Sequence, residues 1–368
     1  MDMPQHSQPA RERLPGLDGV RALSIGLVLL CHMATLHGMP RWPWLLAIAD
    51  RGQVGVEIFF VLSGFIITWL LLKEEEKTAA VDLRQFYIRR AFRILPAAFT
   101  YLAFVSLLVL LHLSSAHWNE IASAALFTRN LFVNGSSDTG HFWSLAVEEQ
   151  FYLTWPFLFV LLGKRSRAAL LIALLAISPL WQHEYFRLFP HTKIIVFEFH
   201  YEPLLMGCLL ALCHSSKQIS YVLSGRVFQS TGMFIACVAM IAVLLSPLED
   251  RVGARMQVLF PLGEYACIAL IINYLIQGGQ TPVSWLLNTP PLVYVGQLSY
   301  SLYLWQQPFC YAGSALAFMA PWCLFPAMAG AAFSYYCIEQ PALRLRQRLQ
   351  QRRQFRPSIE PALLAVQA

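Results

Sequence analysis

Apolar residues in this chain form long runs that are separated by short polar segments. A helix needs about 20 predominantly apolar residues to cross a bilayer, so runs of this length predict membrane-spanning helices. We expect an all-α fold, a polytopic transmembrane helical bundle of about ten spans. The predicted spans cover residues 18–37, 54–72, 94–113, 142–163, 168–182, 193–213, 228–247, 257–277, 292–312 and 315–337.

The composition supports a membrane protein over a soluble one. Hydrophobic residues make up 57% of the 368 positions and charged residues only 13%, with a mean hydropathy of +0.51. A soluble domain of this size does not carry so much apolar surface. The N-terminal stretch is polar, and no small-residue cleavage site follows the first apolar run, so we expect that run to be a retained helix and not a signal peptide.

The distribution of Lys and Arg predicts the orientation. Most of the 27 basic residues lie in alternate segments between the predicted spans, on the side of the N-terminus. Cytoplasmic segments are enriched in these residues, so we expect both termini in the cytoplasm, as an even number of spans requires. We divide the chain into a membrane domain, residues 1–341, and a basic cytoplasmic tail, residues 342–368.

The eight cysteines are scattered through apolar runs and form no CxxC pair. Metal sites and redox pairs in proteins usually show closely spaced cysteines, whereas isolated cysteines are small core residues. We therefore expect no metal cofactor.

The first apolar run contains two ionisable residues, Arg21 near its start and His32 well inside it. Eleven helical residues span about 16 Å and return to within about 20° of the starting direction, so both side chains share one helix face. Ionisable residues at membrane depth are costly and usually face a polar cavity or pathway. The spacing therefore indicates a cation near one membrane surface and a titratable base deeper in the membrane.

The loop after the second predicted span ends in a basic group that includes Arg90 and Arg93. Their i, i+3 spacing places them on one helix face. One interpretation is a positive anchor at the cytoplasmic surface. The other is a binding site for a phosphorylated cytosolic ligand, because guanidinium groups bind phosphate in a bidentate manner.

Two adjacent carboxylates, Glu148 and Glu149, lie in the fourth predicted span. They project about 100° apart, so a single cavity holds at most one of them centrally. Glu148 shares a polar face with Ser144 and Tyr152, whereas the face of Glu149 carries leucines. We therefore expect Glu148 to be the functional carboxylate.

Two further groups of small or polar residues lie within apolar runs. Ser63 and Gly64 in the second span predict a close approach between helices, as small residues do in membranes. Glu198, His200 and Glu202 lie near the outer end of the sixth span. For these three, exposure at the membrane surface is nearly as good an interpretation as a site.

Helix rise predicts that three polar side chains from distant parts of the chain reach a similar depth. His32 and Gln306 each lie about 14 residues, or roughly 21 Å, from the inner surface, and Glu148 lies roughly 9 Å from the outer one. In an apolar core roughly 30 Å thick, all three lie in the outer third. We therefore expect them to share a cavity.

Six motifs, in this order along the chain, resemble the membrane-bound acyltransferase 3 family. They are LDGVRALSIGLVLLCH, VGVEIFFVLSGFIIT, RRAFRILP, WSLAVEEQFY, GQLSYSLYLWQQP and IEQPALR. Together they extend over nearly the whole chain. The family includes bacterial polysaccharide O-acetyltransferases, macrolide acyltransferases and Nod-factor acetylases.

The resemblance assigns roles to several residues. An Arg and a His eleven residues apart on the first helix are regarded as essential in the family, and they correspond to Arg21 and His32. The paired arginines after the second helix correspond to Arg90 and Arg93, and the Glu of the WSLxxE motif corresponds to Glu148.

The chain also departs from the family. Many members read LWH where this chain reads LWQ, so Gln306 can form hydrogen bonds but cannot act as a base. Asp commonly stands where this chain has Glu57. Some members carry a fused extracytoplasmic esterase-like domain that does not follow here, so we expect the membrane domain itself, or a partner, to meet the acceptor.

The resemblance implies an O-acetyltransferase of the bacterial inner membrane that moves an acyl group, in the simplest case acetyl from acetyl-CoA, to a hydroxyl of a carbohydrate or lipid-linked glycan. The expected partners are acyl-CoA, this glycan and the lipid bilayer, and no nucleic acid. The phosphates of the donor suit Arg90, Arg93 and Arg21.

Within this reaction His32 is the natural general base, because an unperturbed imidazole titrates near neutral pH. Glu148 would orient the imidazole or stabilise its cation. Cys31 projects about 100° away from His32, so we favour direct transfer over an acyl-enzyme.

Two other functions remain open from the residues alone. Buried His, Glu and Arg also form proton pathways, so a proton-coupled transporter is the alternative. Transporters often show internal repeats and helices broken at corresponding positions, and the sequence has neither. A non-catalytic membrane scaffold would leave the buried charges unexplained.

Overall fold

The computed structural model describes residues 16–131, 135–188, 201–245, 259–277 and 281–354. Within these ranges the regular elements are all helices, which confirms the predicted all-α fold. The first part contains α1 (Leu17–Met33), α2 (Pro43–Asp50), α3 (Val54–Thr78), α4 (Leu83–Leu110), α5 (Trp118–Ala125), the 3-10 helix η1 (Arg129–Leu131), α6 (Ser137–Gly140), α7 (Phe142–Leu161) and α8 (Lys164–Leu188).

The second part begins after the undescribed residues 189–200. It contains α9 (Tyr201–Ser215), α10 (Lys217–Leu223), α11 (Thr231–Leu244), α13 (Phe260–Gln277), α14 (Pro282–Leu287), α15 (Pro290–Trp305), α16 (Gln307–Cys310), α17 (Leu324–Phe333), the π-helical segment η4 (Ser334–Glu339) and α18 (Gln340–Gln354).

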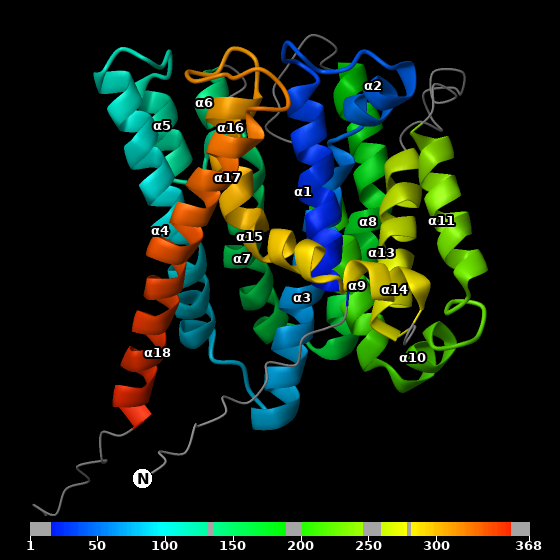
Figure 1. Ribbon diagram of the computed structural model, residues 1–368. Coiled ribbons are helices and arrows are strands. Elements are labelled where there is room, and N and C mark those ends of the chain that lie inside the picture. The colour runs from blue at the N-terminus through cyan, green and yellow to red at the C-terminus, as the bar shows by residue number, and fades with distance from the viewer. Residues whose placement is uncertain (1–15, 132–134, 189–200, 246–258, 278–280, 355–368) are drawn as a thin grey trace, which may run out of the picture.

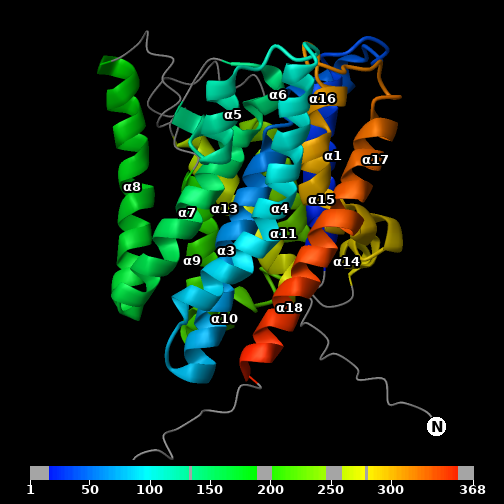
Figure 2. The same cartoon turned by 90° about the vertical axis from the view of Figure 1, so that its left-hand side faces the viewer.

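The long helices lie side by side and run between two ends of the molecule (Figures 1 and 2). The short helices α2, α5, α6 and α16 lie at one end, which we call the upper end after its place in Figure 1. The α3–α4 connection and α10 lie at the opposite, lower end. In the centre, α1 packs against α15 and α3, and α3 packs in turn against α9.

Three helices in the described part of the chain, α3, α4 and α13, are both long enough and apolar enough to cross a membrane. Helix α11 is also apolar but shorter. Large apolar side chains are exposed along the outside of α4, α7 and α8, including Leu110, Leu161 and Leu180. Such a surface suits contact with lipid. The expected count of about ten spans and the cytoplasmic position of both termini stay predictions.

Glycines allow α3 and α9 to pack closely. A Cβ atom at Gly64 would lie 2.0 Å from the carbonyl oxygen of Leu204, and one at Gly207 would lie 2.1 Å from that of Val61. Both distances are shorter than any real contact, so only glycine fits at either position. The predicted role of Gly64 in close helix approach is therefore confirmed.

The last two predicted spans differ from the observed helices. The ninth is interrupted, because α15 ends at Trp305 and the helix resumes as α16, with Pro308 in its first turn. The tenth was expected from residue 315, but α17 begins only at Leu324, after a segment in which Gly313 has a φ of +85° and Pro321 lacks a backbone donor.

Helix α17 continues through η4 into α18 as one rod, visible in orange and red in Figure 1. The helix therefore runs on past residue 342, where we placed the start of the basic tail, as far as Gln354. Residues 355–368 of that tail lie outside the described ranges.

Candidate active site

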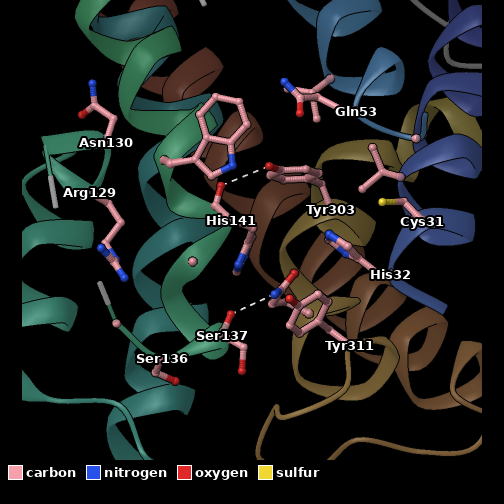
Figure 3. A pocket seen from close by; sticks show the side chains of 17 residues that line it. Cys31, His32, Gln53, Arg129, Asn130, Ser136, Ser137, His141, Tyr303 and Tyr311 are labelled. Atoms are coloured by element: carbon pink, nitrogen blue, oxygen red, sulfur yellow. Dashed lines mark hydrogen bonds between the residues drawn. The ribbon is translucent and has the colours of Figure 1, made fainter. Parts of the chain in front are cut away.

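A cavity of about 500 Å³ opens among the helices near the upper end (Figure 3). This volume lies within the range of small-molecule sites in proteins. Polar side chains from five separate parts of the chain line it. They are His32 from α1, Gln53 just before α3, Arg129 and Asn130 from η1, Ser136, Ser137 and His141 around α6, and Tyr303, Gln307 and Tyr311 from α15, α16 and the residue after it. Apolar contributions come from residues such as Val28, Val56 and Trp143.

His32 is positioned by a hydrogen bond to Gln306. The Nδ1 atom of His32 lies 2.7 Å from Oε1 of Gln306, and the Gln306 side chain is fully buried. The ring of Tyr311 contacts the imidazole edge to face, with 5.2 Å between centroids. The predicted proximity of His32 and Gln306, which are 274 residues apart, is therefore confirmed.

Two more hydrogen bonds extend this contact to the main chain. Nε2 of Gln306 donates to Oε1 of Gln307 at 3.1 Å, and Nε2 of Gln307 donates to the carbonyl oxygen of Ser137 at 2.8 Å (Figure 3). We call His32, Gln306, Gln307 and the Ser137 carbonyl the amide chain.

The amide chain fixes the protonation pattern of His32. A main-chain carbonyl only accepts hydrogen bonds, so the Gln307 group facing Ser137 must be its NH₂. Its oxygen then faces the NH₂ of Gln306, and the Gln306 oxygen faces His32. The imidazole therefore carries its proton on Nδ1, and the lone pair is on Nε2. This is the tautomer that a general base needs if Nε2 is to accept a proton.

Glu148 is not the group that orients His32. Its Oε1 atom accepts hydrogen bonds from Ser63 on α3 and from Tyr152 on its own helix, and it does not line the cavity. The residue of α7 that lines the cavity is Trp143, and Ser144 beside it has its hydroxyl 2.5 Å from that of the cavity residue Tyr303. The sequence argument placed Glu148 at the correct end of its helix, but it could not show that the neighbouring helix there is α3.

The three arginines singled out from the sequence lie near one another, toward the lower end. Arg90 and Arg93 both lie within electrostatic range of Arg21. The guanidinium of Arg90 lies 4.7 Å from the ring centroid of Tyr152, which also bonds to Glu148. We call Arg21, Arg90 and Arg93 the arginine cluster.

A buried carboxylate that sequence reasoning missed completes this region. Oε2 of Glu339 lies 3.9 Å from Nη1 of Arg93, and the Glu339 side chain is only 1% exposed. Its other oxygen accepts a hydrogen bond from Ser301. The motif IEQPALR contained this residue, but nothing in its local pattern predicted a partner on α4.

The comparison with protein families identifies the chain. A family model described as an acyltransferase domain matches residues 14–335. The chain belongs to the acyltransferase 3 family. No solved structure matches it.

Several curated relatives of this acyltransferase 3 protein are named O-acetyltransferases. It is 30% identical over 335 residues to peptidoglycan O-acetyltransferase OatA of Listeria monocytogenes, a match that covers 83% of this chain and 51% of the relative. It is 29% identical over 336 residues to the putative peptidoglycan O-acetyltransferase YrhL of Bacillus subtilis, with 82% and 49% covered. The chain thus spans about half the length of these relatives.

The structure also places two other residues singled out from the sequence of this acyltransferase 3 chain. Cys31, expected to project about 100° away from His32, lines the same cavity (Figure 3). Of the two interpretations left open for Glu202, exposure at the membrane surface is excluded, because the residue is buried; it lies within electrostatic range of Glu57. Glu198 and His200 lie outside the described residues.

The described residues contain no group of three or more His, Cys, Asp or Glu side chains that could hold a metal ion.

Proposed function

We propose that this protein is a multi-pass enzyme of the bacterial inner membrane, with about ten spans, that transfers an acetyl group from acetyl-CoA to a hydroxyl of a cell-envelope glycan. The observation that carries the proposal is the amide chain, which leaves the lone pair of His32 on Nε2 beside a cavity of small-molecule size. Family membership and the names of the relatives supply the reaction class.

The arginine cluster is the proposed binding site for the donor. Acyl-CoA carries its phosphates at one end and its thioester at the other. Arg90 and Arg93 are partly exposed, and guanidinium groups pair with phosphate through two parallel hydrogen bonds. Arg21 lies about 16 Å from His32 along α1, so an elongated donor suits a phosphate site toward the lower end and a reaction site toward the upper end.

The distribution of charge supports the orientation. Lys and Arg residues gather at the end of α3, at the start of α4, around α10 and in α18, which all lie toward the lower end (Figure 1). A cytoplasmic lower end fits the preference of basic residues for that side. Acyl-CoA would then bind from the cytoplasm, and the cavity would face the glycan outside, with both termini in the cytoplasm.

The transfer needs one base and balances without a further reagent. Nε2 of His32 accepts the proton of the acceptor hydroxyl as its oxygen attacks the thioester carbonyl. The tetrahedral intermediate then collapses, the C–S bond breaks, and the imidazolium returns the proton to the CoA thiolate. The Nδ1–H···Oε1 bond to Gln306 becomes stronger while the imidazole is charged, which stabilises both transition states.

In this scheme Glu148 acts near the donor and not on the imidazole. Its hydrogen bond from Tyr152 holds that ring against the guanidinium of Arg90. Because Ser63 of α3 donates to the same carboxylate, Glu148 links the helix that carries Arg90 to the core. We assign it a positioning role in donor binding and turnover.

The full-length protein in vesicles of phosphatidylethanolamine and phosphatidylglycerol tests the proposal, with acetyl-CoA as donor and chitopentaose as acceptor. Release of free CoA and mass spectrometry of the oligosaccharide report the reaction. His32→Ala should lower turnover by about 10²–10⁴-fold, the usual contribution of a general base. His37→Ala, an exposed histidine four residues beyond α1, is the matched control and should keep full activity.

Two outcomes would contradict the proposal. His32→Ala activity within a few-fold of wild type would exclude the general-base role. If the wild-type protein turns over no acetyl-CoA but moves protons with a solute across the vesicle membrane, the transporter alternative would be favoured.

A further inference from the structure

His141 is a second buried imidazole in the cavity, and its ring nitrogens are unused. It lies between α6 and α7 and is 4% exposed. Neither Nδ1 nor Nε2 has a hydrogen-bond partner among the described residues. Buried polar atoms in native proteins are nearly always paired, so two unpaired nitrogens on one side chain need an explanation.

The surroundings hold this ring firmly but leave its nitrogens free. The rings of Tyr101, Phe142 and Tyr303 contact it edge to face, with centroids 5.0–5.5 Å away. Its carbonyl oxygen accepts hydrogen bonds from Ser144 at 3.1 Å and Tyr303 at 3.0 Å. The main chain at His141 is therefore fixed, and the aromatic contacts restrict the side chain.

Neighbouring hydroxyl groups are already used elsewhere. The Tyr101 hydroxyl donates to the carbonyl oxygen of Asp138 at 2.7 Å, and the Tyr303 hydroxyl is shared between the His141 carbonyl and Ser144. These groups are not available to the imidazole nitrogens without breaking existing bonds. The partner that His141 lacks is therefore expected to come from the cavity.

The two histidines differ in how they are prepared. His32 and His141 line the same cavity and lie within electrostatic range of each other. Figure 3 shows the His141 ring pointing into the space between its own helix and the wall that carries His32. His32 has one nitrogen bound to the amide chain, whereas His141 has both nitrogens free. A neutral imidazole with no fixed partner can present an N–H to a substrate atom.

We propose that His141 is a catalytic residue whose N–H donates to the carbonyl oxygen of the transferred acyl group, opposite the base His32. The proposal rests on the acyl-transfer function above. Negative charge develops on this oxygen when the hydroxyl attacks, and a preorganised donor in a site of low polarity stabilises it. The N–H of His32 is committed to Gln306, so His32 cannot supply this donor while Nε2 acts as the base.

The assignment predicts a ranking of three variants of full-length protein in the same vesicle assay. His141→Ala should lower kcat by about 10²–10³-fold, the usual loss when one such donor is removed. Its KM for acetyl-CoA should stay close to wild type, because the bond strengthens only in the transition state. His141→Phe keeps an aromatic ring among Tyr101, Phe142 and Tyr303 but has no N–H, so it should be as slow as His141→Ala.

His141→Gln should recover much of the activity, since its amide supplies an N–H at a similar reach. Its pH profile of kcat should keep the wild-type shape, because the base is still His32. Thermal unfolding of each detergent-solubilised variant checks that the variant is folded, so that differences in kcat are not caused by unfolding.

Each other result would overturn the assignment. Wild-type kcat in His141→Phe would show that the ring serves packing alone. Equal losses in the Gln and Phe variants, or a Gln variant whose pH profile has lost one limb, would show that His141 moves a proton. If wild-type protein itself releases no CoA, the proposed function fails, which is a different result from a failure of this inference.

Discussion

Replacing Gln306 by Met should slow acyl transfer without weakening donor binding. Met fills a similar volume but cannot accept the hydrogen bond from Nδ1 of His32, which is 2.7 Å long. While the imidazole is charged, this bond is charge-assisted and worth about 1.5–3 kcal/mol. Since about 1.4 kcal/mol corresponds to a factor of ten in rate, kcat should fall by about 10- to 150-fold.

The next residue of the amide chain, Gln307, provides a second loss of kcat with which the loss in Gln306→Met can be compared. Gln307→Met removes two bonds between neutral groups, one to the Ser137 carbonyl and one of 3.1 Å to Gln306. Only the second reaches the partner of the base, and it is worth about 0.5–1.5 kcal/mol. The base keeps its direct partner, so kcat should fall by only about 2- to 12-fold. Gln229→Met removes a side-chain amide that donates to Gln277 away from the cavity and should leave kcat unchanged.

Steady-state release of CoA from acetyl-CoA in proteoliposomes, with and without chitopentaose, measures both kcat and KM for the three variants. Donor affinity is measured separately by equilibrium binding of a non-transferable acyl-CoA thioether. A loss in Gln307→Met as large as that in Gln306→Met would refute the reasoning from an ordered chain. A Gln306→Met variant with a higher KM for acetyl-CoA and an unchanged kcat would refute it as well.

The remaining predictions concern the charged groups. Arg90→Ala and Arg93→Ala should each weaken acyl-CoA binding by about 10- to 100-fold, and Lys at either position should restore only part of the loss. The acyl-CoA affinity of the wild-type protein should fall as the salt concentration rises. Unchanged affinity in both Ala variants would leave these arginines as topology anchors. Glu148→Gln should lower kcat strongly, because it weakens the acceptor of the Ser63 and Tyr152 hydrogen bonds. Glu149→Gln should have a mild effect on kcat, because no hydrogen bond is described for the Glu149 side chain. A larger loss of kcat at Glu149 than at Glu148 would contradict the helix-face argument.

Helical periodicity predicted much of the architecture and one half of the site. It predicted the all-α fold and the depth at which Gln306 meets His32. These succeed because rise and angle per residue are nearly constant along a helix. Depth along the membrane, however, carries no information about which helices are neighbours, and this is why Glu148 was wrongly expected beside His32.

The remaining parts of the site depend on contacts outside any one helix. The bond between Gln307 and Ser137 joins residues 170 positions apart and involves a main-chain oxygen, which no side-chain pattern reveals. His141 lies two residues before the motif WSLAVEEQFY, but the pair of carboxylates inside that motif drew the functional interpretation. What distinguishes His141 is that its nitrogens have no partner among the described residues, and only the three-dimensional structure can show that.

The π-helical segment η4 has a mechanical consequence for the rod formed by α17 and α18. A π turn holds one residue more than an α turn, so it rotates everything after it by about 100° relative to an unbroken α-helix. If this segment returned to α-helical spacing, Glu339 would swing around the axis, away from Arg93 and Ser301, and α18 would turn with it. The six residues of η4 therefore determine how far the helix is rotated about its axis. This rotation fixes both the ion pair with α4 and the direction in which the arginines of α18 point.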